Sequence, residues 1–289
     1  MATQRPAIVR VAIVRLILTF ALLVGAYLGA QAAVYYAVKA APANLHDTAK
    51  IASQIGVCAL MLLFYVFVVW LLEGRRAKEL ALGPGIPQAI GGAVVGLGAF
   101  CAVYGVLLAM GVAHWHGVAG DYSGLVPAAL AAMIAGIGEE LAVRGGLFRV
   151  LEDSLGTLLA VAVSAAVFGL LHSQNKGANT VSTVAIMLES GILLAAAYAM
   201  TRNLWFPIGL HFGWNWTEGG VFGEAVSGGA MKGAVKISMT GPDLLTGGAF
   251  GPEASVVAIA VSVIISLVMI VITIRSGRWK PLGFRMMLD

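Results

Sequence analysis

The sequence predicts an all-α protein embedded in a membrane. Of its 289 residues, 60% are hydrophobic and only 11% are charged, and the mean hydropathy is +0.91. Soluble globular domains carry about 25% charged residues, so this composition excludes an ordinary water-soluble domain. The hydrophobic residues form unbroken runs of about 20 residues rather than alternating segments of about ten, which favours helices over a transmembrane β-barrel.

Eight apolar stretches are long enough to cross about 30 Å of hydrocarbon as helices. They cover residues 11–37, 51–73, 88–113, 125–150, 156–174, 180–200, 204–222 and 253–274. No internal repeat or low-complexity tract interrupts the series. We therefore expect residues 1–289 to form a single integral membrane domain of about eight transmembrane helices that enclose an intramembrane cavity.

Basic residues at the ends of these stretches predict their orientation. If the first eleven residues lie in the cytoplasm, nine further basic residues fall on the same side: Arg75, Arg76, Lys78, Arg149, Arg202, Arg275, Arg278, Lys280 and Arg285. The opposite side receives five lysines and no arginine: Lys39, Lys50, Lys176, Lys232 and Lys236. This positive-inside bias predicts that both termini are cytoplasmic. It also accounts for the net charge of +4, so no nucleic-acid partner is inferred.

The first stretch has a second interpretation as a secretory signal peptide. Three arginines, Arg5, Arg10 and Arg15, precede an apolar run that reaches the small-residue pattern Ala30-Gln31-Ala32. The run continues well past the usual apolar core of a signal peptide, which favours a transmembrane helix.

The segment between Gly219 and Gly251 differs from the rest, because it is rich in Gly, Ser and Thr and contains two Gly-Pro turn signals. We expect a loop outside the membrane that is longer than a simple connection requires. It either covers the helix ends or forms a flap over a site carried by the preceding helix.

A few ionisable residues lie inside the expected helices, where they are costly and are first interpreted as functional. Arg144 follows Glu140 by four residues, so the two side chains share a helix face and can form an ion pair. Glu139 points about a quarter turn away and lacks that partner. We therefore interpret Glu139 as the acid that is free to act as a general base.

Two further helices carry polar pairs with the same spacing of four residues, Phe168 with His172 and His211 with Asn215. A single histidine in a membrane helix is usually an interhelical hydrogen-bonding residue. Several such groups directed toward one interior indicate a site instead.

The three motifs Glu139-Glu140-x-x-x-Arg144, Phe168-x-x-x-His172 and His211-x-x-x-Asn215 resemble, in order and spacing, those of the CPBP family of intramembrane proteases. This family includes CAAX prenyl endopeptidases, bacteriocin-processing enzymes and abortive-infection proteins. The resemblance covers residues 120–222. It implies hydrolysis of a peptide bond in a membrane-associated peptide or membrane-protein substrate, in the lipid bilayer of a bacterial inner (plasma) membrane.

The resemblance also implies a role for each motif residue. Glu139 and His172 would activate water, and His211 and Asn215 would stabilise the oxyanion. Structural support would come from Glu140, Arg144 and Phe168.

The cofactor is left open between none and a divalent metal such as zinc. In a metalloprotease, Glu139, His172 and His211 would bind the metal with water in the open position. Asn215 is a poor zinc ligand but a good hydrogen-bond donor, which favours the version without metal.

Two other functions use the same residues. A proton-coupled transporter could relay protons along buried Glu and His side chains, although matching broken helices in two halves are lacking. A non-catalytic immunity or scaffold protein would keep the fold without the reaction.

His172 and Glu189 do not fit this interpretation simply. Counted from Arg149, Glu139 lies roughly 15 Å deep in the membrane, whereas His172, counted from Gly156, lies roughly 24 Å deep. The count predicts a mismatch unless the helix of His172 is tilted or begins deeper. Glu189 is a further intramembrane acid outside the three motifs, and it either lines the same cavity or pairs with another helix.

Overall fold

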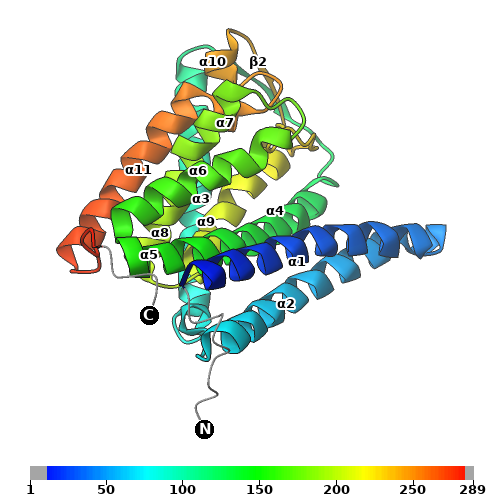
Figure 1. Cartoon of the computed structure of the whole chain (residues 1–289). Coiled ribbons are helices and arrows are strands. Elements are labelled where there is room, and N and C mark those ends of the chain that lie inside the picture. Colours follow the sequence, from blue (N-terminus) through cyan, green and yellow to red (C-terminus); the bar gives the residue numbers. More distant parts are fainter. Residues whose placement is uncertain (1–11, 284–289) are drawn as a thin grey trace.

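The computed structural model describes residues 12–283 as a bundle of helices with one small two-stranded sheet (Figure 1). Within this part of the chain, seven helical segments are long and apolar enough to cross a membrane: Val14–Ala40, His46–Glu73, Gly85–Ala109, Leu125–Leu155, Thr157–Gln174, Thr180–Thr201 and Val256–Arg275. The prediction of an all-α integral membrane protein is confirmed. Residues 1–11 and Arg285 lie outside the described residues, so the cytoplasmic placement of the termini stays a prediction, as does the bacterial inner membrane.

The elements follow one another as α1 (Ala12–Ala40), α2 (His46–Glu73), α3 (Gly85–Ala109), β1 (Ala113–Val118), α4 (Leu125–Glu140), the π-helix η4 (Leu141–Phe148), α5 (Arg149–Leu155), α6 (Thr157–Leu171), α7 (Thr180–Ile186), the π-helix η6 (Met187–Gly191), α8 (Ile192–Thr201), α9 (Trp205–Trp216), the π-helix η7 (Thr217–Phe222), β2 (Val235–Met239), α10 (Asp243–Thr246) and α11 (Val256–Arg275). Short 3₁₀ turns cover Ala43–Leu45, Lys78–Leu80, His172–Gln174 and Pro252–Ala254.

Of the eight predicted membrane-spanning helices, the one expected at 204–222 is shorter in the structure than a membrane span requires. Its α-helical part, α9, has 12 residues, which at 1.5 Å per residue is about 18 Å and too short to cross the hydrocarbon alone. The chain continues as the wider π-helix η7. The described residues therefore hold seven helices of spanning length rather than eight.

Glycines hold α9 tightly against α3. A Cβ at Gly92 would lie 2.1 Å from the carbonyl oxygen of Phe206, and one at Gly209 would lie 2.0 Å from that of Ala89. Gly96 and Gly213 repeat the arrangement one turn further on. Such small-xxx-small pairs let membrane helices approach to backbone contact. They fix α9, and with it the residues on its opposite face.

A turn at Gly156 brings the helices that follow and precede it side by side. The run α4, η4 and α5 continues to Leu155, so Glu139 lies 17 residues before Gly156 and His172 lies 16 residues after it. Both are therefore roughly 25 Å from the turn at 1.5 Å per residue. The predicted mismatch in depth is wrong, because the helix of Glu139 does not end near Arg149.

Arg149 is largely buried and has acidic partners. Its guanidinium forms ion pairs with Glu73 and Glu79, at the end of α2 and in the turn after it. Neither acid is near Arg149 along the chain, so the sequence did not predict these pairs; the cytoplasmic position of Arg149 stays a prediction.

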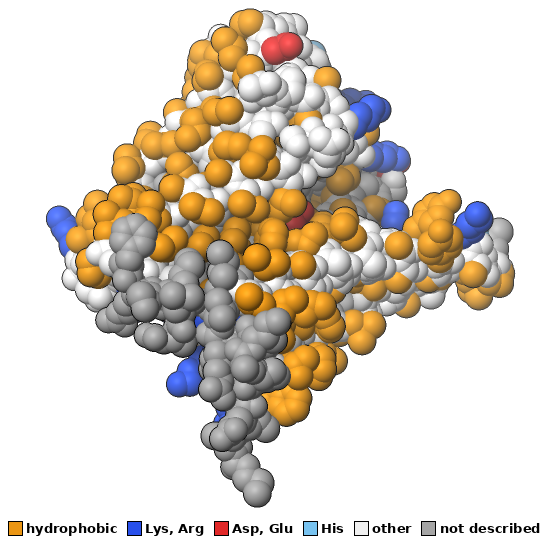
Figure 2. Space-filling view, viewed as in Figure 1, with side chains coloured by type: hydrophobic (Ala, Val, Ile, Leu, Met, Phe, Trp, Pro, Cys, Tyr) orange, Lys and Arg blue, Asp and Glu red, His pale blue; other side chains and the backbone are white. Residues whose placement is uncertain are grey.

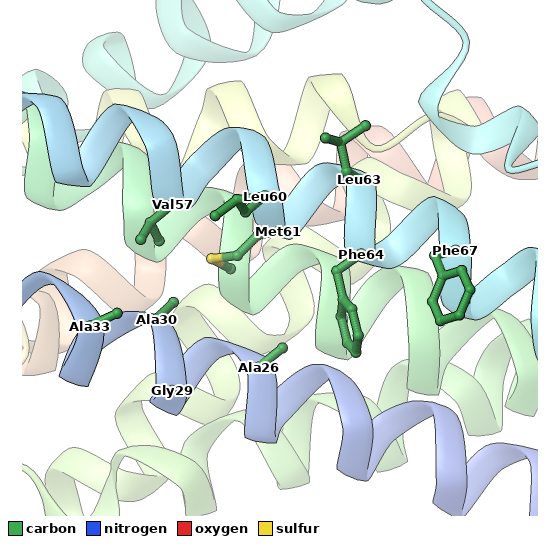
Figure 3. A pocket seen from close by; sticks show the side chains of 10 residues that line it. All are labelled: Ala26, Gly29, Ala30, Ala33, Val57, Leu60, Met61, Leu63, Phe64 and Phe67. Carbon is green, nitrogen blue, oxygen red and sulfur yellow. The ribbon is translucent and has the colours of Figure 1, made fainter.

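Helices α1 and α2 form a long hairpin whose far end extends beyond the other helices (Figure 1). A groove of about 510 Å³ lies between them, where Ala26, Gly29, Ala30 and Ala33 of α1 face larger side chains of α2 such as Phe64 (Figure 3). The groove is lined by apolar residues alone. Hydrophobic side chains also cover much of the visible outer surface of the helices (Figure 2), as expected for contact with lipid.

The predicted loop after α9 is partly structured. Its strand β2 pairs antiparallel with β1, with a bulge between Trp115 and Gly117. His114 and His116, on β1, form hydrogen bonds with the hydroxyls of Thr240 and Ser238, at 2.8 and 2.7 Å.

Candidate active site

Glu140 is fully buried at the end of α4 and has two partners. The Nη1 of Arg144 donates to its Oε1 at 2.8 Å, and the Nδ1 of His211 lies 3.2 Å from the same oxygen. The ion pair expected from the spacing of four residues is therefore present. It persists although the helix widens to the π-helix η4 directly after Glu140, a feature that is frequent at functional sites.

Arg144 connects several elements around this acid. Its Nη2 donates to the carbonyl oxygens of Ser190 and Gly191 in η6, at 3.2 and 3.1 Å. Its guanidinium carbon lies 4.5 Å from the ring centroid of Phe168 on α6, close enough for a cation–π interaction. The ring of Phe168 also contacts His172 and His211, at centroid distances of 4.7 and 6.1 Å.

Glu139 lies beside these residues, and within residues 12–283 its carboxylate is within ion-pair distance of His172 and His211 only. Its Oε2 is 3.7 Å from the Nε2 of His172 and 3.9 Å from the Nε2 of His211. Its side chain keeps 17% of its surface exposed, whereas that of Glu140 has none. The two adjacent acids therefore differ in environment, and Glu139 is the one that reaches an open space.

The two histidines present the same ring nitrogen to Glu139. The Nδ1 of His172 lies 2.8 Å from the carbonyl oxygen of Phe168; since a carbonyl only accepts, Nδ1 carries the hydrogen and donates it. This leaves Nε2 directed at Glu139. His211 has the same arrangement, with Glu140 in place of the carbonyl. Such partners fix the orientation of an imidazole.

Glu139 and His172 line two adjoining cavities. The smaller, about 200 Å³, is also lined by His211 and Asn215, so it brings together the four side chains predicted to be catalytic. The larger, about 430 Å³, extends between α1 and α6 and is mostly apolar, lined by Val24, Tyr27, Leu28, Gln31, Glu139, Ala142, Val143, Leu171, His172 and Asn175.

Sequence reasoning missed two residues of α1 that reach this site. The hydroxyl of Tyr27 donates to Glu139 Oε1 at 3.2 Å, and the side-chain amide of Gln31 donates to that hydroxyl at 3.1 Å. A polar residue inside an apolar helix could have indicated this contact, but Gln31 was interpreted only as part of a signal-peptide cleavage pattern.

The smaller cavity is also lined by residues of the loop after η7, namely Val226, Ser227 and Met231. Ser227 has a positive φ of 48°, which is unusual for a residue other than glycine. Its backbone N–H and its hydroxyl both donate to Glu253 Oε1, at 2.7 and 2.8 Å. The loop thus forms part of the cavity wall.

Glu253 belongs to a second buried group of acids, of which the sequence singled out only Glu189. Glu218 in η7 accepts a hydrogen bond from the backbone N–H of Glu253 at 3.3 Å. Glu189 in η6 lies in the same region and is not among the residues that line the two cavities. Glu218 lies in the stretch expected to be a membrane helix, 204–222, but it was not among the expected intramembrane acids.

The alternative in which Glu139, His172 and His211 bind a metal gains no support from the geometry. Among residues 12–283, no group of three or more His, Cys, Asp or Glu side chains is arranged so that it could hold a metal ion.

Comparison with known proteins identifies the same part of the chain. Residues 121–217, about a third of the sequence, match the family described as Type II CAAX prenyl endopeptidase Rce1-like. No curated protein and no solved structure matches the chain. The matched region contains all three motifs and indicates a protease, so the resemblance to the CPBP family is confirmed. The segment that carries Glu139, Glu140, His172, His211 and Asn215 is therefore similar to the Rce1-like type II CAAX prenyl endopeptidases.

Proposed function

We propose that this protein is an intramembrane endopeptidase in which Glu139 and His172 activate water while His211 and Asn215 stabilise the oxyanion. The observation that supports this most directly is the position of Glu139. It is the partly exposed member of an acid pair, and its Oε2 faces two imidazole nitrogens at the wall of a cavity inside the membrane.

In this mechanism Glu139 is the general base. Its carboxylate accepts a proton from water as the water oxygen bonds to the scissile carbonyl carbon. His172 is fixed through the carbonyl of Phe168 and presents Nε2 as a second acceptor beside the same water. When the tetrahedral intermediate collapses, the C–N bond breaks and Glu139 returns the proton to the departing amine.

His211 and Asn215 are one turn apart on α9 and both line the cavity. An imidazolium at His211 would donate from Nδ1 to Glu140 and carry a hydrogen on Nε2 as well. That hydrogen and the side-chain amide of Asn215 can donate to the negative oxygen of the intermediate. Donors held in place in a site with little water stabilise developing charge strongly.

Glu140 and Arg144 support these groups without touching substrate. Their ion pair is fully buried, and losing one partner of such a pair leaves an uncompensated charge. Arg144 also joins η4 to η6 through two carbonyls. We infer that this pair keeps Glu139, Phe168 and His211 in register.

The larger cavity indicates the type of substrate. It begins at Glu139 and His172 and continues along apolar residues of α1 and α6 such as Val24, Leu28 and Leu171. An apolar part of the substrate can occupy it while the scissile bond lies at Glu139. The substrate that fits is a membrane-associated peptide or protein. No observation in residues 12–283 favours the transporter or the scaffold instead.

The decisive experiment compares peptide termini in membranes from cells that carry the native protein or Glu139→Ala. Products present with the native protein and missing with the variant would identify both the activity and the substrate. His172→Gln should also remove these products, and His116→Gln, at an exposed histidine of β1, is its control. Equal processing by native and Glu139→Ala proteins would contradict the proposal.

A further inference from the structure

Helix α1, outside the segment matched by the protease family, supplies a hydrogen bond to Glu139. The hydroxyl of Tyr27 lies 3.2 Å from Glu139 Oε1, and the amide nitrogen of Gln31 lies 3.1 Å from that hydroxyl. A phenol has one hydrogen to donate. Because Gln31 donates to the phenol oxygen, the phenol hydrogen is left for the carboxylate.

The ring of Tyr27 packs against Gly138, and this contact requires a glycine at position 138. A Cβ at Gly138 would lie 2.2 Å from Tyr27 Cδ2 and 2.6 Å from Met61 Cε, distances at which one group must move. Gly138 directly precedes Glu139, so the backbone next to the acid is shaped to admit the ring. Gln31 is four residues after Tyr27 and on the same face of α1. The contact therefore depends on three positions in two helices.

The two oxygens of Glu139 have different surroundings. Oε2 faces the Nε2 atoms of His172 and His211 at 3.7 and 3.9 Å. In the described residues, the only hydrogen bond to Oε1 comes from Tyr27. The terminal torsion of a glutamate is broad and easily rotated. A donor on one oxygen fixes that torsion and keeps the other oxygen directed at the imidazoles.

We propose that Tyr27, oriented by Gln31 and admitted by Gly138, is a positioning residue that holds the Glu139 carboxylate in its reactive orientation. This inference rests on the proposed role of Glu139 as the base. It gives α1 a part in the reaction that the motif-bearing segment cannot supply.

Tyr27→Phe tests the proposal, because it keeps the ring and removes only the hydroxyl. We expect kcat to fall roughly 10- to 100-fold, the range for a hydrogen bond to a charged group, with KM nearly unchanged. Gly138→Ala should lower kcat at least as much, and Gln31→Leu less. Tyr35→Phe, an exposed tyrosine of the same helix, is the control and should leave kcat unchanged.

A second measurement does not depend on proteolysis. Carbodiimides modify protonated carboxyl groups in membranes, and mass spectrometry can separate labelling of Glu139 from that of Glu140. Because the hydroxyl of Tyr27 occupies Glu139 Oε1, its loss should leave that oxygen open to the reagent. At one fixed pH, labelling of Glu139 relative to Glu140 should therefore rise in Tyr27→Phe, whereas Tyr35→Phe should leave this ratio unchanged.

The two measurements separate failure of this inference from failure of the proposed function. If Tyr27→Phe leaves both kcat and the labelling ratio unchanged while Glu139→Gln abolishes cleavage, the role of Tyr27 is wrong. If the native protein cleaves nothing, the proposed function fails. In that case an unchanged labelling ratio would also overturn the contact, and a raised one would support it.

Discussion

Among the largely buried carboxyl side chains of the protein, the group around Glu139 and the group around Glu253 differ in their partners. Glu139 and Glu140 lie among Arg144, His172 and His211. In the second group, the donors are hydroxyl and backbone groups: Ser190 Oγ to Glu189, the backbone N–H and Oγ of Ser227 to Glu253, and the backbone N–H of Glu253 to Glu218. Within residues 12–283, none of the ion pairs involves Glu189, Glu218 or Glu253.

This difference separates two uses of a buried acid. A carboxylate with a cation beside it can stay ionised away from water, and an ionised acid can accept a proton from a substrate. A buried acid without a cation is instead stabilised as the neutral form. Consistently, burial raises the pKa of Glu253, which lies outside the membrane-spanning helices, although its hydrogen bonds from Ser227 oppose the rise. The first group is suited to chemistry and the second to holding structure together.

The second group of acids supports the wall of the smaller cavity, which is the candidate active site. Glu253 is bonded to Ser227, which lines the cavity beside Val226 and Met231. The strained backbone of Ser227 persists because its surroundings fix it. The loop that was expected either to cover helix ends or to act as a flap is therefore attached to the site through this acid, and its movement stays a prediction.

The largest effect is expected at the first group, for Glu139→Gln. The amide keeps the shape of the side chain but cannot accept a proton, so cleavage should fall by at least about a thousandfold. The thermal unfolding temperature should stay close to that of the native protein. A cleavage assay in liposomes together with a melting curve measures both. Substantial cleavage by this variant would remove the distinction between the two acids.

Glu140→Gln should instead act mainly on stability. It leaves Arg144 buried without its carboxylate, a change that typically costs about 3–5 kcal/mol. Thermal unfolding in detergent should show a clear drop in the unfolding temperature. Arg144→Gln should produce a similar drop. A Glu140→Gln protein as stable as the native one but without activity would reverse the assignment of the two neighbours.

A change in the second group should affect substrate binding more than chemistry. Glu253→Ala removes the acceptor for both donors of Ser227, so the loop should detach and KM should rise, by roughly tenfold, with a smaller change in kcat. Trypsin in membrane vesicles should cut faster after Lys232 and Lys236. The exposed pair of Lys232 with Asp121 adds little, since it is open to solvent. Asp243→Ala, at an exposed acid of the same loop, is the control. Unchanged cutting in Glu253→Ala would show that Glu253 does not hold the loop.

The sequence predicted the contacts of the first group of acids, whereas of the second group it singled out only Glu189, and the reason is physical. Glu140 and Arg144 lie four residues apart on one helix, so helical geometry alone predicted their contact. The convergence of His172 and His211 on Glu139 depended on the resemblance to a family. Tyr27 reaches Glu139 from 112 residues away, and Glu253 joins Glu218 only after the intervening loop folds back. Such contacts depend on how helices pack, which periodicity along the chain does not record.

The pH dependence of loop attachment should distinguish the two groups further. Because the pKa of Glu253 is raised in the folded protein, its protonation stabilises the attached loop. This contribution is complete below the ordinary glutamate pKa of about 4.3 and is lost as the pH rises through the raised value. The groups facing Glu253 are Glu218, Glu189, His172 and Ser227. Relative to Glu253→Gln, which cannot ionise, the native loop should be cut faster as the pH increases. A ratio that is constant with pH would mean that Glu253 does not change its charge when the loop attaches.

The smallest effect on KM and on trypsin sensitivity is expected for Ser227→Gly. The direction of this change shows whether the backbone strain or the hydroxyl hydrogen bond of Ser227 has the larger influence. Glycine adopts a positive φ without strain and keeps the backbone N–H that donates to Glu253 at 2.7 Å, but it loses the hydroxyl that donates at 2.8 Å. Relief of strain and loss of one hydrogen bond nearly offset each other, so KM and trypsin sensitivity should change by less than about threefold. Ser227→Ala loses the hydroxyl and keeps the strain, so it should raise both more. If Ser227→Gly were as damaging as Glu253→Ala, the hydroxyl rather than the backbone would be the contact that attaches the loop to the second group of acids.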